Sequence, residues 1–128
     1  MYDFEIAYYF YRMAKIQEIF EESKYKAKAY FSAAIAIDSY EEYITEKYKE
    51  GTLREIPFIG KSIEKAIVEI IETGCFKQLK DAEKKYDIKD SSILLYHGLS
   101  STLIKKINDG INNGINIIEN PKCVNKEW

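Results

Sequence analysis

Two lysines that follow a glycine make the region around Gly60 the part of the chain with the clearest chemical potential. Lys61 and Lys65 would lie one turn apart on a helix that begins after this glycine. The free backbone N–H groups at such a helix start attract anions, as do the helix dipole and the two ammonium groups. The pattern therefore predicts phosphate binding. The alternative is a solvated helix face on which Lys61 pairs with Glu64 and Lys65 with Glu69.

A second stretch has a similar layout, because Gly98 and Ser100 precede Ser101 and Lys105. The serine hydroxyls could donate hydrogen bonds to a phosphate near the lysine, so this stretch is a second candidate phosphate site. Hydroxyl side chains at a helix start also cap helices without any ligand, and plain capping is the alternative interpretation.

The residue types give little support for metal-dependent or nucleophilic catalysis. The chain has one histidine, His97, and two cysteines, Cys75 and Cys123, that lie far apart in the sequence. Neither a disulfide scaffold nor a structural zinc site is predicted. His97 has no neighbouring cluster that would make it a general base or a metal ligand. We therefore expect no catalytic residue, no metal and no cofactor, and the cysteine usage favours a reducing cytoplasm.

The composition limits the classes of protein to consider. The 128 residues are 46% hydrophobic and 31% charged, which is typical of one globular domain or of two small modules. No uncharged apolar stretch approaches the roughly 20 residues of a membrane-spanning helix, and the acidic start does not resemble a secretory signal. The net charge of −2 excludes a broadly basic nucleic-acid binder, so any contact with a polyanion must be local.

Apolar residues recur mostly at spacings of three and four, so the pattern predicts an all-α fold, a compact multi-helix bundle. Cap residues and glycines divide it into helices expected at residues 3–23, 24–37, 40–50, 61–73, 75–85 and 101–108. Asp3 is expected to cap the first helix, and Asp38 or Ser39 the third. Gly51 and Gly74 are expected to close two helices in the left-handed conformation.

The helix expected at residues 24–37 contains five alanines. Their small side chains let neighbouring helices approach closely, so we expect this helix to lie centrally in the bundle. The bulkier Tyr30, Ile35 and Ile37 are expected to fill the gaps between helices.

An apolar residue, a glycine-bearing turn and a helix follow one another twice, at residues 56–67 and at residues 96–107. Both copies look like helix-hairpin-helix elements, in which a turn with two glycines joins two short antiparallel helices. A glycine there can adopt positive φ and leaves room for a phosphate beside the next helix. Both copies are degenerate, because Phe58 replaces the first glycine of one and Ser100 the second glycine of the other. Two ordinary capped turns are the alternative.

Three blocks, at residues 26–37, 54–60 and 67–79, together strongly resemble the amino-terminal domain of the family X DNA polymerases. The second hairpin resembles the one that opens the fingers subdomain of that family. The resemblance implies a lyase-like helical domain over residues 1–86 and a second hairpin with a C-terminal tail over residues 87–128. It also implies contact with the 5′-phosphate side of a DNA gap, for which Lys26 and Tyr30 keep the matching residue types.

In many members of that family, a lysine of this domain excises a 5′-deoxyribose phosphate through a Schiff base. The matching position here is Ala66, and the position of a phosphate-gripping lysine is Ser62. Lys65 is adjacent to Ala66, but a helix rotates about 100° per residue, so we expect this lysine to point elsewhere. No paired-aspartate motif for two magnesium ions is visible, so we do not expect polymerisation by this chain alone.

Three functions are consistent with these observations. The first is a non-catalytic, repair-related module that binds the phosphates of gapped or single-stranded DNA ends without sequence specificity. The second is a helical protein-interaction or homo-oligomerisation module that has lost DNA binding, which the negative charge and the degenerate hairpins favour. The third is a residual 5′-deoxyribose-phosphate lyase that acts through Lys65, Lys61 or Lys26. No contact with a membrane is expected.

Overall fold

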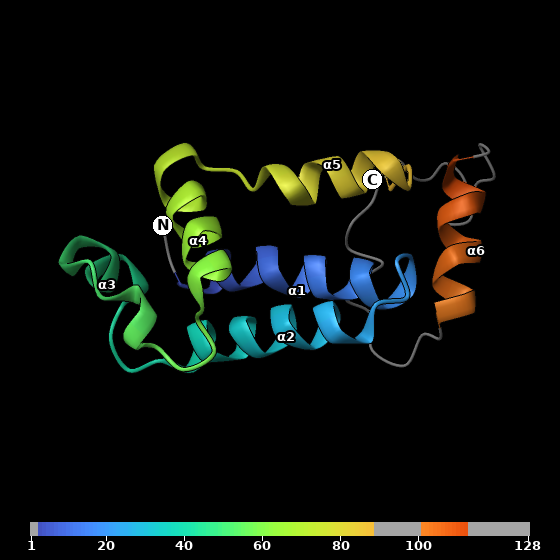
Figure 1. The fold of residues 1–128 in the computed structure, drawn as a ribbon. Helices are drawn as coiled ribbons and strands as arrows, with labels where there is room; N and C mark the ends of the chain where they lie inside the picture. Colours follow the sequence, from blue (N-terminus) through green and yellow to red (C-terminus); the bar gives the residue numbers. More distant parts are fainter. Residues whose placement is uncertain (1–2, 89–100, 113–128) are drawn as a thin grey trace. The chain divides into compact units, whose positions relative to one another are not determined.

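The computed structural model describes residues 3–88 and 101–112, and every regular element within these ranges is helical (Figure 1). This confirms the predicted all-α fold. None of the described helices is long and apolar enough to cross a membrane. The elements in chain order are α1 (Asp3–Ile19), α2 (Lys24–Ser39), α3 (Ile44–Glu50), the 3₁₀ turn η1 (Leu53–Glu55), α4 (Lys61–Thr73), α5 (Lys77–Lys85) and α6 (Ser101–Asn112).

The chain divides into two compact units, residues 1–82 and residues 83–128, which are described separately. In the first unit, α1 and α2 lie side by side and form the main helix pair (Figure 1). Ala33 and Ala34 of α2 are fully buried, but only four of the 16 residues of α2 are buried, whereas eight of the 17 residues of α1 are, so α1 is the more central helix and not the alanine-rich helix as expected. The small side chains of both alanines allow close approach to α1, whose Ile6 and Phe10 are also fully buried.

The boundary between α1 and α2 is set by Ser23. Its hydroxyl accepts a hydrogen bond from the backbone N–H of Lys26 at 3.4 Å, and its backbone is extended, as in an N-cap. Glu22 before it has a positive φ of 56°. As a result α1 ends at Ile19, four residues earlier than the expected end at residue 23.

Asp3 does not cap its own helix, contrary to the prediction. It is the first residue of α1, and its Oδ1 accepts a hydrogen bond from the backbone N–H of Ile44 at 3.1 Å. Asp3 therefore supports the start of α3 from a distant part of the sequence. Asp38 and Ser39 remain inside α2, so α3 begins at Ile44, four residues later than expected.

Local signals located α4 correctly. The helix runs from Lys61 to Thr73, as predicted. Gly51 after α3 and Gly74 after α4 adopt the left-handed conformation, with φ of 74° and 77°. An L-residue pays a steric cost there that glycine avoids, so both glycines end their helices as predicted.

In the second unit, α6 begins at Ser101 as predicted and continues four residues beyond the expected end, to Asn112. Asn108 is buried, and its side-chain amide donates a hydrogen bond to the carbonyl of Tyr86 at 3.3 Å. Most of the second hairpin turn, including Gly98 and Ser100, lies outside the described residues.

Candidate functional site

The first hairpin turn joins η1 to α4 and has the features of a type II turn. The backbone N–H of Ile59 donates to the carbonyl of Ile56 at 3.2 Å, Pro57 is the second residue and Phe58 the third. Phe58 has a φ of 70°, a conformation that normally calls for glycine. The degenerate first position therefore keeps the backbone geometry of a glycine although it carries a large side chain.

Gly60, the second glycine position of this hairpin, does not take a positive φ. Its φ of −89° and ψ of −173° are extended, and it is the N-cap of α4 without any side-chain cap. A Cβ built at this position would meet nothing within 4 Å. Neither backbone conformation nor packing requires glycine here, and the space beside its Cα, at the N-terminal end of α4, is open. The first N–H groups of α4 have no partner within the helix.

Lys61 and Lys65 are exposed on the first two turns of α4. The structure forms neither of the ion pairs that the alternative interpretation required, because neither lysine lies within ion-pair distance of Glu64 or Glu69. Glu69 instead accepts a hydrogen bond from the backbone N–H of Lys77 at 2.8 Å, which supports the start of α5. Both ammonium groups therefore remain available to an anion.

A small cavity of about 240 Å³ lies beside these lysines. Its walls come from α2, from the first turns of α4 and from the start of α5, and the lining residues are Tyr30, Ser62, Lys65, Ala66, Glu69, Phe76 and Gln78. Lys65 and Ala66 both line it, so these neighbouring positions contact the same cavity although they differ by about 100° around the helix axis.

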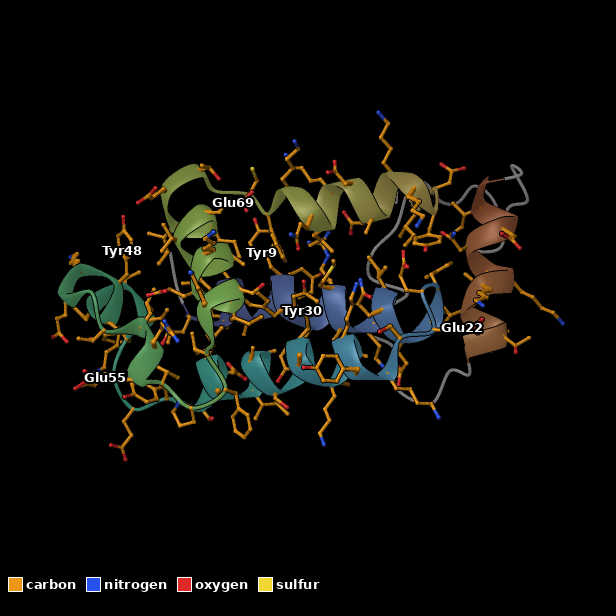
Figure 2. The ribbon with its side chains drawn as sticks, viewed as in Figure 1. Tyr9, Glu22, Tyr30, Tyr48, Glu55 and Glu69 are labelled. Carbon is orange, nitrogen blue, oxygen red and sulfur yellow. The ribbon has the colours of Figure 1, made fainter. Side chains whose placement is uncertain are left out.

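Tyr30, which is labelled in Figure 2, packs against two aromatic neighbours and makes one hydrogen bond. Its ring centroid lies 6.1 Å from that of Phe10 and 6.4 Å from that of Phe76. The hydroxyl donates to Oε1 of Gln78 at 3.2 Å. Burial raises the pKa of Tyr30, so the phenol stays neutral and remains a hydrogen-bond donor at physiological pH.

Exposed lysines on α2 extend the positive surface toward this region. Lys24, Lys26 and Lys28 are all exposed, and residues 24–37 contain no acidic side chain. Lys26 does not line the cavity, but it lies one helical turn before Tyr30 and so faces the same side of α2.

The other predicted site residues are not gathered at this cavity. Gly60 and Lys61 are at the start of α4 but do not line it. In the second unit, Ser101 opens α6 and Lys105 is half-buried on that helix. No group of three or more histidine, cysteine or acidic side chains within the described ranges is arranged to hold a metal ion.

Sequence reasoning missed part of the cavity wall. Phe76 and Gln78 were not singled out, and Glu69 was considered only as an ion-pair partner of Lys65, although the block that contains all three contributed to the resemblance. The only local signal for these residues is the spacing between Glu69 and Lys77, because it allows the Glu69 carboxylate to accept a hydrogen bond from the backbone at the start of α5. No sequence pattern indicates that Gln78 meets Tyr30, 48 residues earlier.

Comparison with known proteins gives one match. A family model described as a helix-hairpin-helix domain matches residues 1–76, which is more than half of the chain. No curated protein matches the chain, and no solved structure does. The matched range contains the hairpin turn, the start of α4 and almost all of the cavity wall.

Proposed function

The chain belongs to the helix-hairpin-helix domain family, whose members generally bind DNA without sequence specificity, and on this premise we propose that it binds DNA through phosphates held at the start of α4. The observation that carries the proposal is the pair Lys61 and Lys65. Both lie on the first two turns of α4 without a carboxylate partner among the described residues, and they follow an N-cap glycine with open space beside its Cα.

The physical basis is the sum of three attractions at one place. The first N–H groups of α4 have no helical acceptor, the helix dipole places partial positive charge there, and the two lysines add full charges. Such contacts read the phosphate backbone and not the base edges, so the proposed binding is independent of sequence.

We assign a terminal 5′-phosphate to the cavity. A terminal phosphate carries more negative charge than an internal diester, and it has no chain on one side to clash with the cavity walls. Ser62 and Lys65 supply donors from α4, whereas the Tyr30 hydroxyl of α2, which already donates to Gln78, shapes the wall opposite them. The resemblance to the amino-terminal domain of family X polymerases favours the same ligand, at a gapped or single-stranded end produced during DNA repair.

Substitution of Gly60 tests this proposal while protecting the fold. Aspartate at an extended N-cap should stabilise α4 by roughly 0.5–1.5 kcal/mol, because it caps the helix and restricts the unfolded chain. Gly60 does not line the cavity, but a carboxylate there would accept from the first N–H groups of α4 and place a negative charge beside Lys61, so Gly60→Asp should bind 5′-phosphorylated gapped DNA at least about tenfold more weakly. Gly60→Ser, which caps without charge, is the matched control and should bind nearly as the wild type does.

The measurement is fluorescence anisotropy with gapped, single-stranded and duplex DNA, each with and without a 5′-phosphate. Lys61→Gln with Lys65→Gln should lose binding, whereas Lys80→Gln with Lys84→Gln removes the same charge from exposed positions of α5 and should lose little. Undiminished binding by Gly60→Asp, or equal losses in both double variants, would contradict the proposed site.

A further inference from the structure

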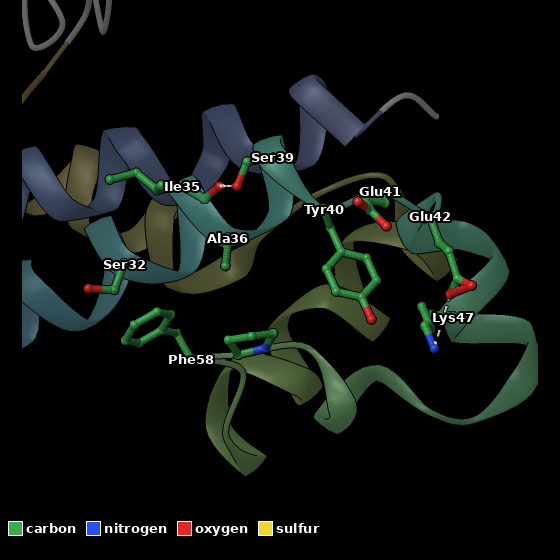
Figure 3. Close-up of a pocket in the computed structure, with 10 residues that line it drawn as sticks. Ser32, Ile35, Ala36, Ser39, Tyr40, Glu41, Glu42, Lys47 and Phe58 are labelled. Carbon is green, nitrogen blue, oxygen red and sulfur yellow. Dashed lines mark hydrogen bonds and ion pairs between the residues drawn. The ribbon is translucent and has the colours of Figure 1, made fainter.

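A larger groove, of about 690 Å³, lies between the C-terminal half of α2 and the hairpin turn (Figure 3). It shares no lining residue with the cavity at Tyr30 and Lys65. Its volume is in the range of protein clefts that hold ligands. The lining residues that matter most are Ile35, Ala36, Tyr40, Glu41, Pro57 and Phe58.

The walls of this groove expose apolar side chains. Ile35 is 54% exposed, contrary to the expectation that it fills a gap between helices, and Phe58 is 71% exposed. Phe58 also holds a positive φ, which costs free energy that its limited burial does not offset. Exposed apolar side chains clustered around a cleft are typical of an interaction surface.

Three polar side chains of the groove, Ser39, Glu42 and Lys47, already have hydrogen-bond or ion-pair partners. The Ser39 hydroxyl donates to a backbone carbonyl of α2 at 2.6 Å. The ammonium of Lys47 lies 3.1 Å from a Glu42 carboxylate oxygen and 3.3 Å from one of Glu55. Glu41 has no ion-pair partner among the described residues, so its carboxylate is the charge that the groove offers to a ligand.

The charge around the groove differs from that of the proposed DNA site. Residues 38–58 contain six acidic and three basic side chains, whereas residues 24–37 contain three lysines and no acidic residue. A negative surface repels phosphates and attracts cationic side chains. We infer that this groove docks a partner protein, through a segment that places large apolar side chains next to lysine or arginine.

Selection of peptides tests this docking site with a defined probe. Random 12-residue peptides displayed on phage are selected on the wild-type chain of 128 residues. Enriched peptides should carry net positive charge and at least two large apolar residues. A synthetic copy of the most enriched peptide is then measured by fluorescence anisotropy.

We expect Ile35→Glu and Phe58→Gly each to weaken peptide binding about tenfold or more. Glu41→Lys should weaken it about three- to tenfold, whereas Glu46→Lys, an exposed reversal outside the groove, should leave it nearly unchanged. Circular dichroism should show unchanged helix content in all four variants, because each replaced side chain is exposed.

Three results would overturn the inference. The selection could yield only neutral or acidic peptides, or none that depends on Ile35. Alternatively, Ile35→Glu and Phe58→Gly could weaken binding of single-stranded DNA, which would assign the groove to nucleobases. The Gly60 variants respond independently of these outcomes, so the docking site and the DNA site are tested separately.

Discussion

Replacing Phe58 by glycine should leave the stability of the fold almost unchanged, whereas replacing it by alanine should lower it. Phe58 has a φ of 70° and a side chain that is 71% exposed. The left-handed conformation costs any L-residue about 1–2 kcal/mol and costs glycine almost nothing. Full burial of a phenylalanine is worth about 1.5–3 kcal/mol, so the fraction buried here is worth only about 0.4–0.9 kcal/mol.

These magnitudes separate the two variants. Phe58→Ala loses the partial burial and keeps the backbone cost, so its free energy of unfolding should fall by about 0.4–0.9 kcal/mol. Phe58→Gly loses the same burial but removes the backbone cost, and the greater freedom of its unfolded chain takes back about 0.4–1 kcal/mol. The glycine variant should therefore be more stable than the alanine variant by about 0.8 kcal/mol and close to the wild type.

Urea and thermal denaturation followed by circular dichroism measure this difference. For a unit of this size, about 0.8 kcal/mol corresponds to a difference in Tm of roughly 3–6 °C. If the alanine variant proved as stable as the glycine variant, Phe58 would not hold a positive φ in solution, and the account of the turn would be wrong.

Three further outcomes are expected. Introducing an amine into the cavity with Ala66→Lys should give a borohydride-trapped adduct with a 5′-deoxyribose-phosphate substrate; an adduct with the wild type would instead show that one of its own amines, such as Lys65, Lys61 or Lys26, is a nucleophile. Burial raises the pKa of Asp3, and the nearby charge of Asp38 adds a smaller increase. Asp3 therefore stabilises the fold fully only below about pH 3.8, the pKa of an unperturbed Asp, and this stabilisation is lost as the pH rises through the raised pKa of the folded chain. Asp3→Asn keeps an oxygen that accepts from the α3 backbone but carries no charge, so this variant should be more stable than the wild type at pH 7 but not at pH 3. Urea midpoints measured at both pH values would show this, and an equal difference in stability at pH 7 and pH 3 would contradict it. Added salt should weaken DNA binding more steeply for the wild type than for the double variant Lys61→Gln with Lys65→Gln. The slopes of log affinity against log salt concentration should differ by about 1.5, as expected for two phosphate contacts, and equal slopes in anisotropy titrations would rule out those contacts.

The sequence by itself determined the helical class, the bounds of α4 and the two glycine-closed helix ends. Each of these depends on interactions within a few residues. Gly60 and Gly74 flank an apolar pattern with helical spacing, and a left-handed helix end favours glycine wherever it occurs. The same local reasoning found Lys61 and Lys65 as candidate binding residues, whereas Tyr30 was proposed from the resemblance to the family X polymerases.

Features that depend on distant segments were decided only by the tertiary structure. The cavity needs Gln78 to return to Tyr30 across 48 residues, and Asp3 supports α3 across 41. Whether Ile35 is buried depends on which helices cover it, and none does so fully. The conformation of Phe58 could not be predicted from local sequence either, because the local preference at a position with positive φ is for glycine. Its positive φ arises in a turn whose flanking Ile56 and Ile59 are both buried, and burial is a property of the assembled fold and not of a short stretch of sequence.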